Sequence, residues 1–262
     1  MKIPFYQVDA FTNELFKGNP AGVCIVDEYP DNEVMQKVAA ENNLAETAFV
    51  KRVTDEQFFI RWFTPVAEVD LCGHATLASA FVLFEQLGFD KDKIVFDTLY
   101  RGMLEVSKEE DWYWLDFPTD EIKTAEITEE LKAAFPLRPD SILKGKTDYV
   151  LVYSHQKQVE ETKPDFSKLA LVDARGVIVT AKGDKVDFVS RFFAPQIGID
   201  EDPVTGSAHT SLTPYWSKVL EKKTLHALQL SERGGVLKCN YLGERVTIGG
   251  QARLFLEGTI II

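Results

Sequence analysis

Glu46 is the side chain in this sequence whose surroundings best suit it to move protons. Its neighbours in the segment LAETAF (residues 44–49) are all small or apolar. Loss of water makes a carboxyl group a weaker acid, so that it can both accept and donate protons near neutral pH. We therefore treat Glu46 as a candidate general acid and base. The alternative is a surface glutamate at the edge of a strand.

His74 and Asp202 are the next catalytic candidates. His74 follows Gly73 at the predicted start of a helix, where the helix dipole favours a neutral imidazole that could donate a hydrogen bond to a substrate oxygen or relay a proton. Asp202 precedes the segment PVTGS (residues 203–207) at the matching point of a second half. The structural alternatives are a capping or core histidine and an ordinary acidic loop residue.

Four further residues are candidates for substrate binding. Asn19 lies in the tight loop GNPAG (residues 18–22) and could orient a ligand, although turn chemistry alone explains an asparagine there. Gly73, Gly206 and Ser207 open two predicted helices. The unpaired N–H groups at such helix starts attract anions, so these positions suit a carboxylate ligand.

Two segments 130 residues apart share one pattern. Residues 61–65 (RWFTP), followed by the glycine at 73, are echoed by residues 191–195 (RFFAP), followed by the glycine at 206. The repeat predicts two similar halves, each directing a helix N-terminus toward a cleft between them. An ungapped alignment of the halves places Glu46 opposite Gly176, so the shared scaffold does not require this carboxylate. That makes Glu46 the first candidate for chemistry.

The same pattern predicts an α+β fold of two similar domains related by a pseudo-two-fold axis, each a mixed sheet wrapped around a central helix. We place the N-terminal domain at residues 1–117, completed by a C-terminal strand at 253–262, and the other domain at 118–252. The central helix of the first domain, from residue 75 to about 87, is apolar on all faces, as is typical of a buried helix. Another helix is expected over residues 32–41, with Asp31 as its cap.

Composition and charge exclude several classes of protein. The 262 residues are 45% apolar and carry a formal charge of −12, which is typical of a globular protein and repels nucleic acid. Cys24, Cys72 and Cys239 form no C-x-x-C pair, so neither a disulfide framework nor a zinc site is expected. The N-terminus lacks the features of a signal peptide, and the apolar stretch at residues 75–84 is too short to cross a bilayer. We expect a cytoplasmic protein with no membrane attachment and no metal.

Signatures of cofactors and hydrolases are missing from the sequence. There is no G-x-G-x-x-G motif, and Asp140 stands where a phosphate-binding loop ending at residues 145–147 would need its first glycine. A hydrolase triad of Ser207, His209 and Asp202 is disfavoured, because the sequence around Ser207 lacks the glycine pattern of a nucleophile elbow. We therefore expect no cofactor.

Four blocks of sequence, in this order, resemble the PhzF-like phenazine-biosynthesis isomerases. They are GNPAG (residues 18–22), AETA (45–48), GHAT (73–76) and DPVTGSA (202–208), and the resemblance covers essentially the whole chain. It implies the diaminopimelate-epimerase fold, a homodimer, and cofactor-free isomerisation typified by conversion of trans-2,3-dihydro-3-hydroxyanthranilate. It also implies that Glu46 shuttles the proton, with His74, Asp202 and Ser207 around a small cyclic or unsaturated carboxylate.

Two alternatives to the isomerase stay open. The more distant epimerases of this fold work with two cysteines, one at each helix start. Cys72 occupies one such position but Thr205 stands at the other, and a hydroxyl is too weak an acid to replace a thiol without strong activation. An epimerase or racemase of a small amino or hydroxy acid is thus the first alternative. A catalytically inactive binding or scaffold protein that has kept the fold is the second.

Overall fold

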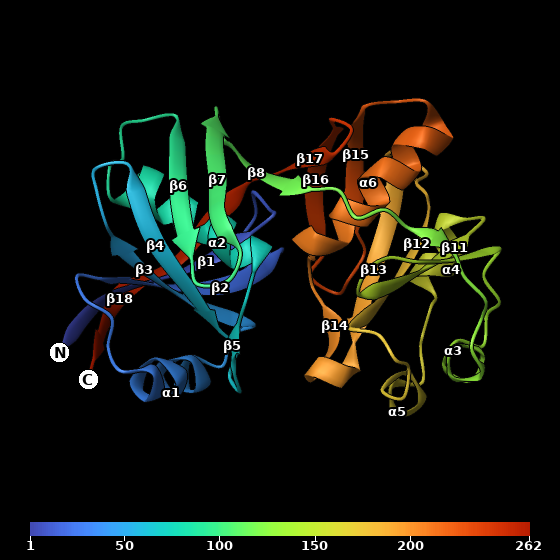
Figure 1. The fold of residues 1–262 in the computed structure, drawn as a ribbon, viewed down its shortest axis with the longest axis horizontal. Coiled ribbons are helices and arrows are strands. Elements are labelled where there is room, and N and C mark those ends of the chain that lie inside the picture. The colour runs from blue at the N-terminus through green and yellow to red at the C-terminus, as the bar shows by residue number, and fades with distance from the viewer. The chain divides into compact units, whose positions relative to one another are not determined.

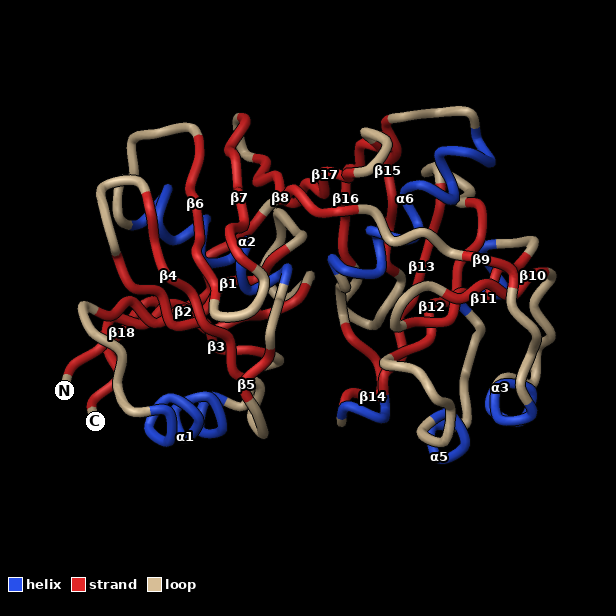
Figure 2. The backbone as a smooth tube through the Cα atoms, viewed as in Figure 1, coloured by secondary structure: helices blue, strands red, loops and turns tan.

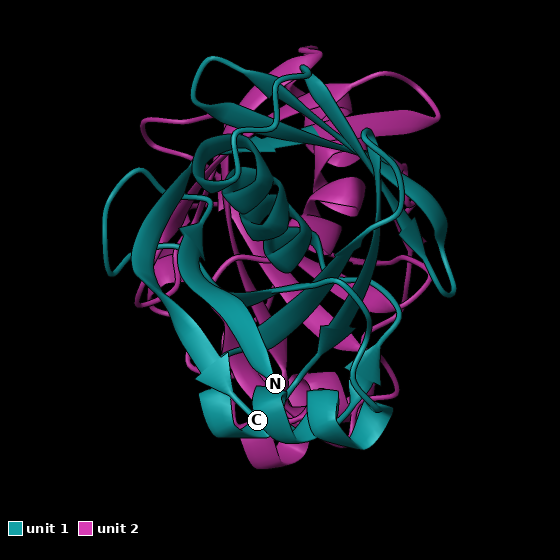
Figure 3. Ribbon diagram, turned by 90° about the vertical axis from the view of Figure 1, so that its left-hand side faces the viewer, with its two compact units in different colours: residues 1–117, 248–262 teal, residues 118–247 magenta.

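The computed structural model describes residues 1–262, which form two compact units (Figures 1, 2 and 3). Unit 1 consists of residues 1–117 and 248–262, and unit 2 of residues 118–247. Both units mix strands and helices, so the fold is α+β. The chain returns to unit 1 at Ile248, within strand β17 (Arg245–Gly250), whereas the sequence predicted this return at residue 253.

The strands of unit 1 form a mixed sheet. In pairing order they are β18 (Ala252–Ile261), β1 (Lys2–Ala10), β2 (Asn19–Val26), β3 (Glu46–Arg52), β4 (Gln57–Phe63), β6 (Lys93–Thr98), β7 (Gly102–Glu109) and β8 (Trp112–Pro118), and the short β5 (Glu68–Val69) also pairs with β4. The pairs β2 with β3 and β4 with β6 are parallel, and the others are antiparallel. Glu46 is the first residue of β3 and lies beside Ala21 of β2.

The central helix of unit 1 is α2 (Gly73–Phe81), which continues into a π-helical turn, η1 (Val82–Gln86). Every residue from His74 to Phe81 is buried, and the helix packs against β1, β2 and β3. The hydroxyls of Thr76 and Ser79 donate to carbonyls one turn earlier, at 2.6 and 2.7 Å, which satisfies these polar groups inside the core. The helix predicted from residue 75 to about 87 is thus an α-helix only as far as Phe81, and from Val82 to Gln86 it is a π-helical turn.

Helix α1 (Asn32–Asn42) covers the apolar cluster around Met35 and Val38. Asp31 occupies the cap position, but its side chain makes no capping hydrogen bond, so its predicted capping role is wrong. The helix ends at Asn43, which adopts the left-handed conformation with φ of 50°.

The strands of unit 2 repeat the pairing order of unit 1. They are β9 (Lys123–Thr124), β10 (Ser141–Lys144), β11 (Asp148–Tyr153), β12 (Gly176–Lys182), β13 (Phe188–Ala194), β15 (Thr224–Gln229) and β16 (Gly235–Tyr241), and the short β14 (Ile199–Asp202) also pairs with β13. The pairs β11 with β12 and β13 with β15 are parallel, as are β2 with β3 and β4 with β6. The repeat in sequence is thus a repeat in topology.

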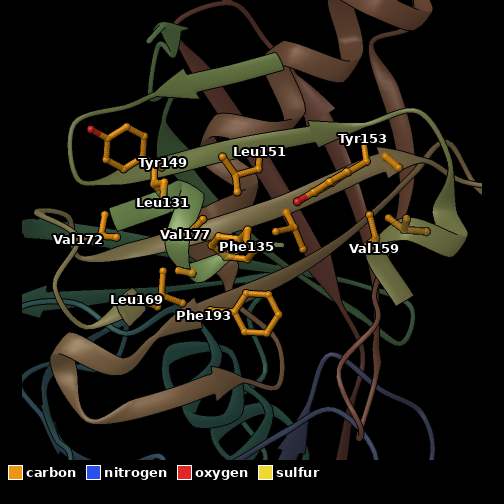
Figure 4. Packing of buried hydrophobic residues seen from close by; sticks show 14 residues of the cluster. Leu131, Phe135, Tyr149, Leu151, Tyr153, Val159, Leu169, Val172, Val177 and Phe193 are labelled. Carbon is orange, nitrogen blue, oxygen red and sulfur yellow. The ribbon is translucent and has the colours of Figure 1, made fainter. Parts of the chain in front are cut away.

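Helices pack on both faces of the unit 2 sheet. On one face α3 (Glu129–Ala134), α4 (Gln156–Glu160) and α5 (Phe166–Leu169) bury a core that includes Leu151, Val177 and Phe193 (Figure 4). On the other face, α6 (Gly206–Leu220) packs against β15 and β16, and the Trp216 indole donates to Thr180 Oγ1 at 3.0 Å. A short 3-10 helix, η2 (Pro195–Ile197), precedes β14. None of the helices is both long and apolar enough to cross a membrane.

The arginine of the repeated motif makes the same contact in both units. Arg61 donates twice to Glu68, at 2.7 and 2.7 Å, and Arg191 donates twice to Glu201, at 2.6 and 2.9 Å. Each guanidinium also lies over a ring of its own strand, Phe63 or Phe193. A bidentate pair that joins two neighbouring strands is a scaffold element. The motif therefore fixes the loop that leads into each central helix.

Candidate active site

Glu46 and His74 contact each other in unit 1, because the start of β3 lies beside the start of α2. Glu46 is the first residue of β3 and His74 the second residue of α2, and the distance from Glu46 Oε2 to His74 Nε2 is 3.0 Å. Their side chains are 12% and 6% exposed. Oε2 is buried and receives no hydrogen bond of regular geometry, so charge attraction rather than an aligned hydrogen bond holds the pair.

Asn19 fixes the other side of the His74 ring. Its Nδ2 lies 3.1 Å from His74 Nδ1, and its side chain is fully buried at the start of β2. An amide can present either its NH2 group or its oxygen to a ring nitrogen, so Asn19 can form a hydrogen bond with His74 in both protonation states of the imidazole. The preceding Gly18 has φ of +65°, and a Cβ there would stand 2.1 Å from the carbonyl oxygen of Ala10. Only glycine lets the chain present Asn19 in this way.

The pKa of His74 is raised well above its ordinary value. Burial alone would lower the pKa of the ring, but Cys72 and Glu46 beside it favour the charged form and outweigh burial. The sequence had suggested a neutral imidazole held by the helix dipole. A full negative charge 3.0 Å away is stronger than the partial charge of a helix end, so the structure favours an imidazolium instead.

Cys72 completes the cluster and occupies the position before α2, where its side chain makes no capping hydrogen bond. Its Sγ lies 3.5 Å from His74 Nδ1 and 3.9 Å from Nε2. Burial first, and then the nearby Glu46 carboxylate, raise the pKa of the thiol to about 11. Cys72 is thus a neutral thiol at pH 7 and a poor base, which argues against a two-thiol racemisation.

In unit 2 the start of α6 carries a different set of side chains. Thr205 is the residue before the helix, and its hydroxyl donates to Asp202 Oδ2. Gln229 accepts from the Thr205 N–H at 2.8 Å and donates to the Asp202 carbonyl oxygen at 2.8 Å and to Thr205 Oγ1 at 3.2 Å. Because Thr205 Oγ1 accepts from Gln229, its own proton is directed to the Asp202 carboxylate. Ser207 is the second residue of the helix and not its cap.

Gln229 is a site residue that the sequence analysis missed. It ends β15, is 1% exposed, and faces inward with Leu225 and Ala227. A polar residue at an inward position of an alternating strand was the available signal, because buried amides need partners. Sequence spacing alone could not identify Thr205 and Asp202 as those partners.

The predicted residues fall into two sets. Unit 1 brings together Glu46, His74, Asn19 and Gly73, and unit 2 holds a second set. The members of that second set are Asp202, Gly206 and Ser207. Unit 2 has no carboxylate at the position of Glu46, where Gly176 begins β12.

Comparison with solved structures defines the class of protein. A hydroxyproline epimerase from Agrobacterium vitis superimposes with a TM-score of 0.62 at 10% identity, covering 99% of this chain and 92% of that one, which shows a shared fold. A PhzF-family phenazine biosynthesis protein from Enterococcus faecalis superimposes with a TM-score of 0.96 at 46% identity, over 100% of both chains. The PhzF-family protein of Bacillus anthracis gives 0.87 at 25% identity, again over 100% of both chains. The fold is that of the PhzF-like and epimerase-like proteins.

Sequence comparison then gives the family. The model of the phenazine biosynthesis-like proteins, PhzC-PhzF, matches residues 8–258. An uncharacterized isomerase of Pseudomonas aeruginosa is 50% identical over 261 residues, 99% of each chain, and the phenazine biosynthesis-like domain-containing protein of Homo sapiens is 40% identical over 287 residues, 99% of each. This chain belongs to the PhzC-PhzF family and is an isomerase of the PhzF type. The resemblance inferred from the four sequence blocks is confirmed.

Proposed function

We propose that this protein is a cofactor-independent isomerase that moves a proton between two carbons of a small cyclic or unsaturated carboxylate, with Glu46 as its single acid and base. The observation that supports this most is the buried Glu46 Oε2, 3.0 Å from His74 and without an aligned hydrogen-bond donor. A carboxylate oxygen in this state has a lone pair available for a proton. Gly176 at the matching place of unit 2 offers no second acid.

The reaction begins when the Glu46 carboxylate takes a proton from a substrate carbon. The C–H bond breaks, an O–H bond forms on Glu46, and the electron pair of the C–H bond enters the unsaturated system of the substrate. The proton on Glu46 exchanges with solvent, and the O–H bond then breaks as a proton passes to a different carbon, so that Glu46 becomes a carboxylate again. One group performs both transfers, so both take place on one face of the substrate.

His74 has two roles in this scheme. As an imidazolium it places a positive charge 3.0 Å from the carboxylate oxygen that takes the proton. It also lies where it can stabilise negative charge that develops on the substrate during proton transfer. Asn19 holds the ring in place from its far side.

The helix starts supply the anion-binding groups. The N–H groups at Gly73 in unit 1, and at Gly206 and Ser207 in unit 2, open helices of 9 and 15 residues. Unpaired N–H groups and the helix dipole favour a carboxylate there. We assign Asp202, held by Thr205 and Gln229, to a polar contact with substrate.

The experiment uses proton exchange in deuterated water on a panel of cyclic amino and hydroxy carboxylates. An isomerase gives deuterium at a new carbon together with a shifted double bond. An epimerase gives label at one centre with equilibration of two stereoisomers, which would replace the proposal. If no compound exchanges but small carboxylates or a protein partner bind tightly, the protein is a binding or scaffold protein instead.

A further inference from the structure

We infer that Asp120 is a positioning residue for the start of α6, the helix whose first N–H groups we assign to substrate binding. Asp120 lies at the beginning of unit 2, just after the chain leaves unit 1 at Phe117. Its backbone and its carboxylate each form a hydrogen bond with α6. The effect on substrate rests on the proposed function, whereas the attachment of the helix does not.

The backbone contact fills a gap that Pro214 leaves in α6. Proline has no N–H group, so the carbonyl oxygen of Thr210, four residues earlier, loses its usual partner within the helix. The N–H group of Asp120 donates to this oxygen at 3.2 Å. Asp120 therefore replaces the hydrogen bond that the proline removes, and the helix depends on a segment outside itself at this point.

The carboxylate makes a second contact with the next residue of the helix. Ser211 Oγ donates to Asp120 Oδ2 at 2.9 Å, and Ser211 is only 2% exposed. The N–H group of Lys146 donates to the same carboxylate, at 3.2 and 3.3 Å from its two oxygens. Gly145 permits this approach, because a Cβ there would stand 2.1 Å from Asp120 Oδ2. The carboxylate thus joins α6 to the segment between β10 and β11.

These contacts lie one turn from the residues that we assign to substrate. Ser207 and Ser211 are four residues apart and therefore on one face of α6. Thr210 Oγ1 donates to the carbonyl oxygen of Ser207 at 2.7 Å. Asp120, Thr210 and Ser207 are thus joined by consecutive hydrogen bonds. Loss of the Asp120 contacts should let the first turn of α6 move.

The helix of unit 1 is held in a different way. Every residue of α2 from His74 to Phe81 is buried, so packing on all sides fixes its start. In α6, Ser207 and Thr210 are only half-buried. The first turns of α6 are therefore less deeply packed, and hydrogen bonds from Asp120 supply part of what packing supplies in α2.

The first test measures the start of α6 by NMR relaxation on the full chain, without substrate. The Gly206 and Ser207 amides of the wild type should be rigid, with order parameters of about 0.85, and Asp120→Ala should lower them toward about 0.6. Asp120→Asn keeps an oxygen for Ser211 and should stay close to the wild type. Glu121→Ala is the matched control, because the Glu121 side chain is 84% exposed. Unchanged order parameters in a folded Asp120→Ala protein would overturn the inference.

Two further variants keep the Asp120 side chain. Ser211→Ala removes one of its hydrogen bonds and should lower the same order parameters by a smaller amount. Pro214→Ala returns an N–H group to the helix that competes for the Thr210 carbonyl, so the Asp120 amide should exchange with solvent faster than in the wild type. Order parameters and exchange equal to those of the wild type in these two proteins would also overturn the inference.

The second test uses a carboxylate that the wild type isomerises. Asp120→Ala should raise KM by about 3- to 10-fold, as the loss of one hydrogen bond does, and leave kcat within about twofold, because the helix start binds substrate and transition state alike. A purely structural role would instead reduce the fraction of active protein and lower kcat at unchanged KM. Asp120→Asn should restore KM.

The outcomes of the two tests can be told apart. Lower order parameters with an unchanged KM would overturn the role toward substrate while leaving the attachment of the helix. If the wild type isomerises no carboxylate, the proposed function fails, and the NMR test still decides whether Asp120 positions α6.

Discussion

The ring of Phe192 occupies the space that any side chain at Gly176 would need. A Cβ built on Gly176 would stand 2.4 Å from the tip of that ring, and Gly176 lies beside Asp148 in β11 as Glu46 lies beside Ala21 in β2. The two units share a pairing order, yet only unit 1 has room for a carboxylate at the start of this strand. The asymmetry that marks Glu46 in the sequence thus has a steric cause.

Replacing Gly176 should destabilise the protein without adding chemistry. Gly176→Ala forces Phe192 to move and should lower the free energy of unfolding by about 1–3 kcal/mol, as overpacking does. Gly258→Ala is the control, because its Cβ would meet nothing closer than a Leu256 methyl at 3.7 Å. Urea unfolding measures both variants. Equal losses in the two would show that Phe192 does not exclude a side chain.

Gln229 should stabilise the start of α6. In Gln229→Ala the buried Thr205 N–H loses its acceptor and the Thr205 hydroxyl loses one of its two hydrogen bonds, so the free energy of unfolding should fall by about 1–3 kcal/mol. The Thr205 amide should also exchange with solvent faster than in the wild type. The exposed Gln196→Ala serves as the control. Unaltered exchange at Thr205 would mean that Gln229 does not hold this segment.

His209 should make unit 2 sensitive to acid. Burial lowers the pKa of His209 to about 4, although the Thr205 carbonyl accepts a bond from its ring at 2.9 Å. The unfolded chain, with an ordinary histidine pKa near 6.5, therefore binds more protons between pH 6.5 and 4. Stability should fall as pH drops through this window, by roughly 3 kcal/mol at its acid end.

His209→Gln tests this contribution directly. The variant should lose less stability between pH 7 and pH 5 than the wild type does, when unfolding by urea is compared at the two values. Identical losses in variant and wild type would show that His209 does not titrate in the way its burial requires.

The repeated arginines should differ in importance despite their common contact. Arg191 Nη1 donates to the carbonyls of Val159, Glu160 and Thr162, the last at 2.7 Å, whereas Arg61 Nη1 donates to Asn32. Lysine cannot reproduce the fork, so both replacements should destabilise the protein. Arg191→Lys should cost more than Arg61→Lys in thermal unfolding. If Arg61→Lys destabilised the protein more than Arg191→Lys, the hydrogen bonds of Arg191 to the three backbone carbonyls would not add the expected stability.

The fold class and the family could be predicted from the sequence, because short local blocks of residues indicate both. The repeat of an aromatic strand, a proline and a glycine-led helix predicted two similar halves, and the pairing order repeats accordingly. The reasoning failed where an outcome depends on contacts between distant segments. The charge state of His74 depends on Glu46, and the role of Gln229 depends on Thr205, which no local pattern reveals. The catalytic roles of Glu46, His74 and Asp202 stay predictions.

The central claim is that Glu46 alone carries the proton. The direct measurement is the rate of deuterium incorporation at carbon, followed by NMR in deuterated water for any carboxylate that the wild type isomerises, compared with Glu46→Gln. The amide keeps the size of the side chain but cannot take a proton, so exchange should fall by about 10²–10⁴-fold or more while thermal unfolding stays close to that of the wild type. Incorporation at the wild-type rate by a folded Glu46→Gln protein would contradict the account.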